Sequence, residues 1–185
     1  MSNETRRALL TQALWPEGAQ SRLGVWAIFD CARDPSIYAA LLESRLEFRC
    51  LYSGRLPRLL EVNAPHLVEL LPGHRLTARC LDEGWGQSWG VFVKIDDPSN
   101  LRHHLRKFLK VRDEQGRSLI FRYYDPRVLR TYLPTCTDSE LRELFGPIKA
   151  WLAESGDQES LLEFGFDGRA LRTKAWPAAE LGAAA

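Results

Sequence analysis

The sequence predicts an α/β fold in which a mixed β-sheet is flanked by helices within a single compact domain. Apolar runs of strand length alternate with segments of helical spacing along most of the 185 residues. Aspartate caps helix N-termini and proline fits the first helical turn, so helix starts are expected at three Asp-Pro pairs, Asp34-Pro35, Asp97-Pro98 and Asp125-Pro126. A hairpin expected near Gly116 adds an antiparallel pair, which excludes a purely parallel sheet.

The remaining elements follow from the same two periodicities. Two further helices are expected, one over 76–81 and one after Thr137, where Thr137 and Glu140 have the spacing of a capping box. Strands are expected over 25–29, 47–52, 64–71, 88–93, 118–124 and 147–153.

Composition also suggests where the domain begins and ends. A polar lead-in over 1–22 contains one expected helical turn near 8–14. The α/β domain is expected over 23–153, and an acidic C-terminal extension with a frayed end over 154–185.

The stretch from 117 to 136 contains the most informative local pattern. Residues 118–124 alternate and are apolar on both sides, which is typical of a strand inside a sheet. Asp125-Pro126 ends this strand and begins a helix, so that Arg122, Arg127 and Arg130 gather around the turn. These charges form either a solvated rim or a recognition edge, because loops at strand ends often expose binding sites.

Charge is balanced overall but unevenly distributed. The net charge is +1, yet 102–130 holds nine basic and three acidic residues, and 138–167 holds eight acidic and two basic residues. Such segregation favours charged docking faces. The aromatic side chains near the basic stretch alternate as core residues should, and the acidic stretch would repel a polyanion, so no nucleic-acid partner is expected.

Four widely spaced cysteines, with no CxxC pair, favour a reduced cytoplasmic compartment. No apolar run approaches the length that spans a membrane, and the N-terminus has no signal-peptide core, so no membrane association is expected.

Motifs of catalysis and cofactor binding are largely missing. Gly84, Gly86 and Gly90 precede a strand instead of following one, so they lack the arrangement that cradles a dinucleotide. The histidines have no partners at metal-ligand spacing, and no metal or cofactor is expected. One catalytic alternative stays open, a small hydrolase-like enzyme that uses Asp30 and Asp125 with Arg122 at a sheet edge.

Four segments carry a family resemblance: 29–38 (FDCARDPSIY), 83–90 (EGWGQSWG), 102–108 (RHHLRKF) and 121–129 (FRYYDPRVL). In this order, across about 25–152, the chain resembles the adaptor (chaperone) domain of bacterial type VI secretion, also called Tap or TEC. The resemblance implies a cytoplasmic, non-enzymatic protein that binds a cognate secreted effector and helps to load it onto the VgrG spike protein.

A binding protein is therefore the first hypothesis, and the contacts expected to carry it are cationic and aromatic. Arg122, Arg127 and Arg130 are expected to meet an acidic partner surface. Trp85 and Trp89, in the glycine-rich turn, become partner anchors if they are exposed and packing residues if they are buried.

Overall fold

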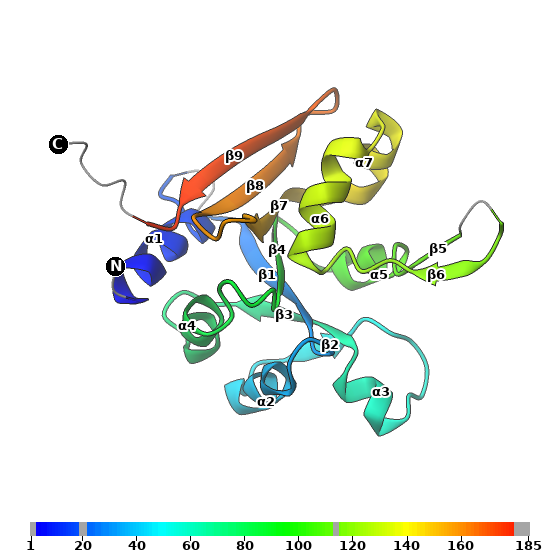
Figure 1. Cartoon of the computed structure of the whole chain (residues 1–185), viewed down its shortest axis with the longest axis horizontal. Coiled ribbons are helices and arrows are strands. Elements are labelled where there is room, and N and C mark those ends of the chain that lie inside the picture. The colour runs from blue at the N-terminus through cyan, green and yellow to red at the C-terminus, as the bar shows by residue number, and fades with distance from the viewer. Residues whose placement is uncertain (1–2, 19–21, 113–114, 180–185) are drawn as a thin grey trace.

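The structure is a computed structural model that describes residues 3–18, 22–112 and 115–179 (Figure 1). A seven-stranded sheet of order β2-β3-β1-β4-β7-β8-β9 forms its centre, and β5 and β6 make a separate two-stranded sheet. The single α/β domain with a sheet flanked by helices is confirmed. The elements are α1 (Asn3–Leu14), β1 (Gly24–Asp30), α2 (Pro35–Ser44), β2 (Phe48–Cys50), α3 (Arg58–Val62), β3 (Pro65–Leu70), α4 (Arg75–Asp82), β4 (Gly90–Ile95), α5 (Leu101–Arg106), β5 (Lys110–Arg112), β6 (Ser118–Ile120), α6 (Pro126–Tyr132), the 3₁₀ turn η2 (Leu133–Thr135), α7 (Asp138–Phe145), β7 (Ile148–Glu154), β8 (Ser160–Phe166) and β9 (Leu171–Pro177).

The sheet separates two hydrophobic layers. Apolar side chains of α1, α2 and α4 pack on one face, together with β1 residues such as Ala27 and Phe29. Side chains of α5, α6 and α7 pack on the other face, with Ile28 and Trp151. Successive residues of β1 thus serve opposite layers, which explains why its sequence is apolar from Val25 to Phe29.

The direction of the strands differs from the prediction of a mixed sheet. Every strand pair in the described part of the chain is antiparallel, including β1 with both of its neighbours. The alternation of strands with helices along the sequence does not determine whether two neighbouring strands run parallel or antiparallel. Here the connections bring each strand back antiparallel to its neighbour.

Residues 118–124 are the clearest local disagreement. Only 118–120 form a strand, and this strand pairs with β5 in a hairpin that projects from the body (Figure 1). Val111, Leu119 and Ile120 in this hairpin are exposed. The expected hairpin is thus confirmed, although Glu114 of its turn lies outside the described residues, but the position inside the main sheet was wrong.

Helix starts were predicted more accurately than strand limits. Asp34 and Asp125 cap α2 and α6 with Pro35 and Pro126 in the first turn, and α7 begins with the predicted capping box at Thr137. At the third Asp-Pro pair, Asp97 accepts from the backbone N–H of Ser99 at 2.9 Å, and α5 begins only at Leu101.

Both ends of the chain are more ordered than the sequence suggests. The lead-in contains the twelve-residue helix α1, which buries Leu10, Ala13 and Leu14. The predicted boundary after residue 153 falls inside β7, and β8 and β9 extend the same sheet. Ala178 is buried, and of the end expected to fray, 180–185 lie outside the described residues.

A buried lysine joins these two ends to the sheet. Lys94, on β4, is 1% exposed. Its Nζ donates to the carbonyl of Ala13 on α1 and to Oε2 of Glu163 on β8, both at 2.9 Å. The same Oε2 accepts from the indole Nε1 of Trp176 on β9 at 2.8 Å. One charge pair therefore connects four elements.

We predict that Lys94→Met lowers the free energy of unfolding by about 3–5 kcal/mol, because the Glu163 carboxylate is left buried without its countercharge. The control is Lys149→Met, since Lys149 is 57% exposed and its pair with Asp96 lies at the surface; its loss should cost about 1 kcal/mol or less. Urea unfolding of both variants measures the difference. Equal small losses of unfolding free energy would contradict the structural role of the Lys94–Glu163 pair.

Candidate functional site: a junction of four segments

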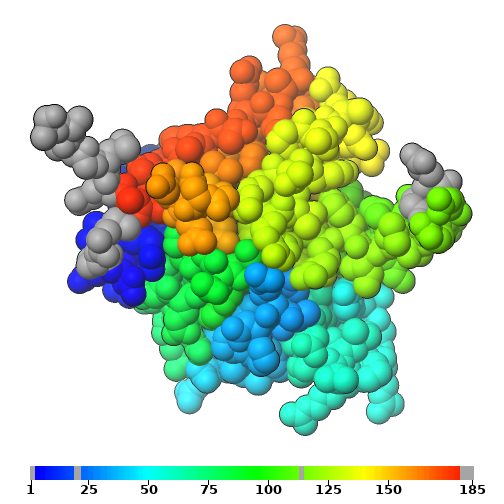
Figure 2. Space-filling view, in the orientation of Figure 1, coloured from blue at the N-terminus to red at the C-terminus, as the bar shows by residue number. Residues whose placement is uncertain are grey.

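Four segments that are distant in sequence meet on one face of the molecule, and we call this region the junction. They are 30–34 after β1, 84–90 before β4, 122–130 around the start of α6, and 154–158 at the β7–β8 turn. Figure 2 shows the corresponding blue, green, yellow-green and orange surfaces meeting at the centre of the view. Three of the segments overlap the motifs that carry the family resemblance.

The first link of the junction is an ion pair between the end of β1 and the turn before α6. Asp30 is 2% exposed, and Nη2 of Arg122 donates to its Oδ2. The Arg122 side chain is 44% exposed. The pair therefore hides its anion and presents its cation to solvent.

A tight turn, instead of a strand, positions Arg122. The backbone N–H of Asp125 donates to the carbonyl of Arg122 at 2.9 Å. Between them, Tyr123 and Tyr124 are buried, and the Tyr123 hydroxyl donates to the carbonyl of Leu105 at 2.9 Å. The tyrosines fix the turn from below and leave the guanidinium of Arg122 at the surface.

Asp125 is both a helix cap and the partner of a second arginine. Its Oδ1 accepts from the backbone N–H and from Nε of Arg127, each at 3.0 Å, and its Oδ2 accepts from Nη2 at 2.6 Å. Burial acts to raise the pKa of Asp125, but the bonds from Arg127 outweigh it and lower the pKa. The sequence predicted the cap, but it gave no sign of the bidentate pair.

Glu154 binds the glycine-rich turn. Its Oε2 accepts from the backbone N–H of Gly86 at 2.6 Å, and its Oε1 accepts from the N–H and the hydroxyl of Ser88, each at 3.1 Å. Nη1 of Arg130 donates to the backbone carbonyl of Glu154 at 3.3 Å. Nε of Arg33 donates to the carbonyl of Gln87 at 3.2 Å, which ties the other side of the turn.

The two tryptophans of this turn have different positions. Trp89 is 4% exposed and meets Phe29 edge-on, with ring centroids 6.4 Å apart. A Cβ on Gly84 would lie 2.8 Å from the Trp89 ring, so glycine is required for this packing. Trp85 is partly exposed, and its Nε1 donates to the carbonyl of Gln158 at 3.0 Å. Trp89 is thus a packing residue, and Trp85 reaches the surface.

The geometry favours recognition over acid–base chemistry. Asp30 and Asp125 are each bound to their own arginine, and the lowered pKa of Asp125 is the opposite of what a general acid requires. The buried oxygens accept, while the outward guanidinium groups retain donors for a partner. Arg122, Arg127 and Arg130 lie around the start of α6, and Trp85 belongs to another segment of the junction, which the sequence did not predict; each of the four already has an internal contact.

One pair of potentially reactive groups was not found from the sequence. Sγ of Cys31 lies 3.4 Å from Nδ1 of His66, on a neighbouring strand. The same Nδ1 is 2.9 Å from the carbonyl of Ala64, so it carries the hydrogen and donates to that oxygen. Burial raises the pKa of the Cys31 thiol to about 12. The pair is therefore an inert part of the core.

Two searches of the described residues give negative results. Within 3–18, 22–112 and 115–179, no group of three or more His, Cys, Asp or Glu side chains is placed to hold a metal ion. In the same ranges, each helix is too short or too polar to cross a membrane. The four cysteines are free thiols.

We predict that Asp125→Ala lowers the free energy of unfolding at pH 7 by at least the 0.5–2 kcal/mol that a lost cap costs, roughly, since Arg127 also loses its partner. Because the folded-state pKa of Asp125 is lowered, its contribution is present above the unfolded value of about 3.9 and is lost as the pH falls through the folded value. Urea titrations at stepwise lower pH should therefore converge for variant and wild type.

The matched control is Asp34→Ala, which removes the equivalent cap of α2. Asp34 accepts from the backbone N–H of Ser36 at 2.7 Å but is fully exposed and forms no ion pair within the described ranges. The Asp34→Ala variant should therefore lose only the stabilisation that the cap provides. Normal stability of Asp125→Ala with a loss of partner binding would contradict the structural role and assign Asp125 to an interface.

Comparison with known proteins agrees with the resemblance carried by the junction. A family model described as "Domain of unknown function (DUF4123)" matches residues 25–143, well over half of the chain. Neither a curated protein nor a solved structure matches the chain. The chain belongs to this family, which is known as the effector-loading adaptor (Tap/TEC) domain of type VI secretion.

Proposed function

We propose that the protein is a cytoplasmic adaptor that binds a cognate type VI secretion effector and helps to load it onto the VgrG spike protein, without catalysing a reaction. Membership of the family supports an effector partner. The observation that carries the proposal is the junction, where the family-like motifs converge and present guanidinium groups over buried carboxylates.

In this proposal the junction docks an acidic surface of one partner. Arg122 and Arg127 are about half exposed and keep free donors, and Trp85 adds a partly exposed ring in another segment of the junction. Their internal ion pairs hold the side chains in place, so less conformational entropy is lost on binding than for free arginines. Trp89 supports the turn from below. The proposed mode of action requires no cofactor, nucleic acid or membrane.

We expect purified adaptor, effector and spike protein to form a ternary complex, and effector and spike to associate poorly without the adaptor. Size-exclusion chromatography with mass measurement tests this directly, and effector secretion from a strain that lacks the adaptor tests it in the cell. A complex of effector and spike that forms equally well without the adaptor, together with unchanged secretion, would overturn the proposal.

Neutralising the junction should slow association with the acidic partner. The double variant Arg127→Gln and Arg130→Gln is preferable to charge reversal, because an acidic residue at 127 would repel Asp125. The rate constant for association should fall most at low salt, where the screening length is about 30 Å instead of about 8 Å. Stopped-flow measurements at both salt concentrations check this expectation.

The control variant removes the same charge elsewhere. This control is the double variant Lys110→Gln and Arg112→Gln. Both residues lie on the exposed strand β5 of the projecting hairpin, away from the junction. If both double variants slow association equally, the effect is one of net charge. Wild-type rates for the junction variant at low salt would make the arginines a solvated rim.

A further inference from the structure

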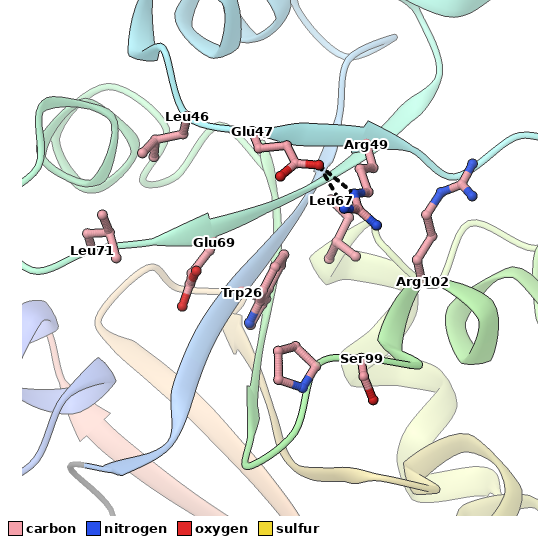
Figure 3. Close-up of a pocket in the computed structure, with 10 residues that line it drawn as sticks. Trp26, Leu46, Glu47, Arg49, Leu67, Glu69, Leu71, Ser99 and Arg102 are labelled. Carbon is pink, nitrogen blue, oxygen red and sulfur yellow. Dashed lines mark hydrogen bonds and ion pairs between the residues drawn. The ribbon is translucent and has the colours of Figure 1, made fainter.

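A groove lies at the β2–β3 end of the sheet, on the face that carries α5, α6 and α7 elsewhere. Its volume is about 290 Å³, near the lower end of the range for ligand pockets. Figure 3 shows side chains of β1 and β3 in its floor, with the approach to β2 on one side and 98–102 on the other. The groove shares no lining residue with the junction.

The floor combines an indole ring with a carboxylate. Trp26 on β1 and Glu69 on β3 are direct partners in the antiparallel register, so their side chains lie next to each other on the same face. Leu67 and Leu71 flank Glu69 on this face; Leu67 is 2% exposed, whereas Leu71 is 41% exposed. The carboxylate is thus placed between apolar groups.

The charges that line the groove are not equally available. Nε and Nη2 of Arg102 donate to the carbonyls of Cys50 and Tyr52, at 2.9 and 3.3 Å. Nη2 of Arg49 lies 2.7 Å from Oε1 of Glu47, as the dashed lines in Figure 3 mark. The side chain of Glu69 forms no hydrogen bond or ion pair within the part of the chain that the structure describes. Arg102 keeps its positive charge, but two of its nitrogens are held by carbonyl oxygens, so Glu69 is the charged group of the described lining that is left without a partner.

We propose that this groove binds an extended segment of a partner protein in which an arginine lies between apolar side chains. The guanidinium would stack on Trp26 and pair with Glu69, two interactions that suit its planar, delocalised charge. Apolar side chains two residues before and after the arginine lie about 6.6 Å away on an extended chain, the same spacing that separates Leu67, Glu69 and Leu71. This inference takes one point from the proposed function, namely that the protein binds other proteins.

The test uses a capped pentapeptide, acetyl-Leu-Ser-Arg-Ser-Leu-amide, as the probe. A matched peptide carries citrulline, which keeps the shape of arginine without its charge. Binding is followed through the indole N–H signal of Trp26 in ¹H–¹⁵N spectra, which the Trp26→Phe variant identifies. We expect a saturable shift with the arginine peptide and about fivefold weaker binding of the citrulline peptide, equivalent to roughly 1 kcal/mol.

Glu69→Gln should abolish this discrimination, so that both peptides bind with similar dissociation constants. Glu69 is exposed, and thermal unfolding confirms that the variant keeps its fold. Glu61→Gln on α3, an exposed carboxylate outside the groove, is the control and should discriminate as the wild type does. Equal binding of the two peptides to the wild type, or no shift of the Trp26 signal at millimolar peptide, would overturn the proposal.

One further outcome would show a different occupant, and the peptide assay can fail independently of the proposed adaptor function. Sedimentation of the wild type as a dimer and of Glu69→Gln as a monomer would show that a second copy of the chain occupies the groove, and would overturn the proposal. The peptide assay uses neither effector nor spike. Its failure therefore leaves the proposed adaptor function intact, and failure of the ternary complex leaves the peptide result intact.

Discussion

The junction depends on the buried carboxylate of Glu154. It satisfies two backbone N–H groups and a hydroxyl of the glycine-rich turn, and its own backbone carbonyl accepts from Arg130. Without it, the N–H groups of Gly86 and Ser88 would lose their acceptor, and an unsatisfied buried donor costs about 1–3 kcal/mol. Glu154 lies beyond the family match at 25–143. In this chain, a strand outside the matched region therefore holds one of the family-like motifs in place.

The features that the sequence predicted well are those with a local cause. The caps at Asp34 and Asp125 and the capping box at Thr137 each satisfy N–H groups within three residues. The prediction of a strand over 118–124 was wrong because the alternation of apolar residues there results from tertiary packing and not from a strand. Tyr123 is buried because a turn places its side chain against α5. In the sequence, a tyrosine buried by such a turn has the same pattern as one buried by a strand.

The C-terminal strands and the buried lysine were missed for different reasons. Asp167-Gly168 between two strand-like segments is a hairpin signal, and the Asp167 carboxylate accepts from the N–H groups of Arg169 and Ala170, both at 2.9 Å. An acidic composition over 154–185 obscured this signal. Lys94 gave none, because lysine is almost never fully buried and its partners Ala13 and Glu163 are 81 and 69 residues away in sequence.

Strand β1 connects the junction with the groove. Trp26 and Asp30 are four residues apart on β1, so they lie on the same face and about 13 Å from each other. β1 is paired on both sides, with β3 and with β4, which fixes this spacing. If partners bind at both surfaces as proposed, a conformational change along β1 is a poor route for coupling between them. Any cooperativity would then arise from direct contact between the two partners, or from one partner that reaches both surfaces.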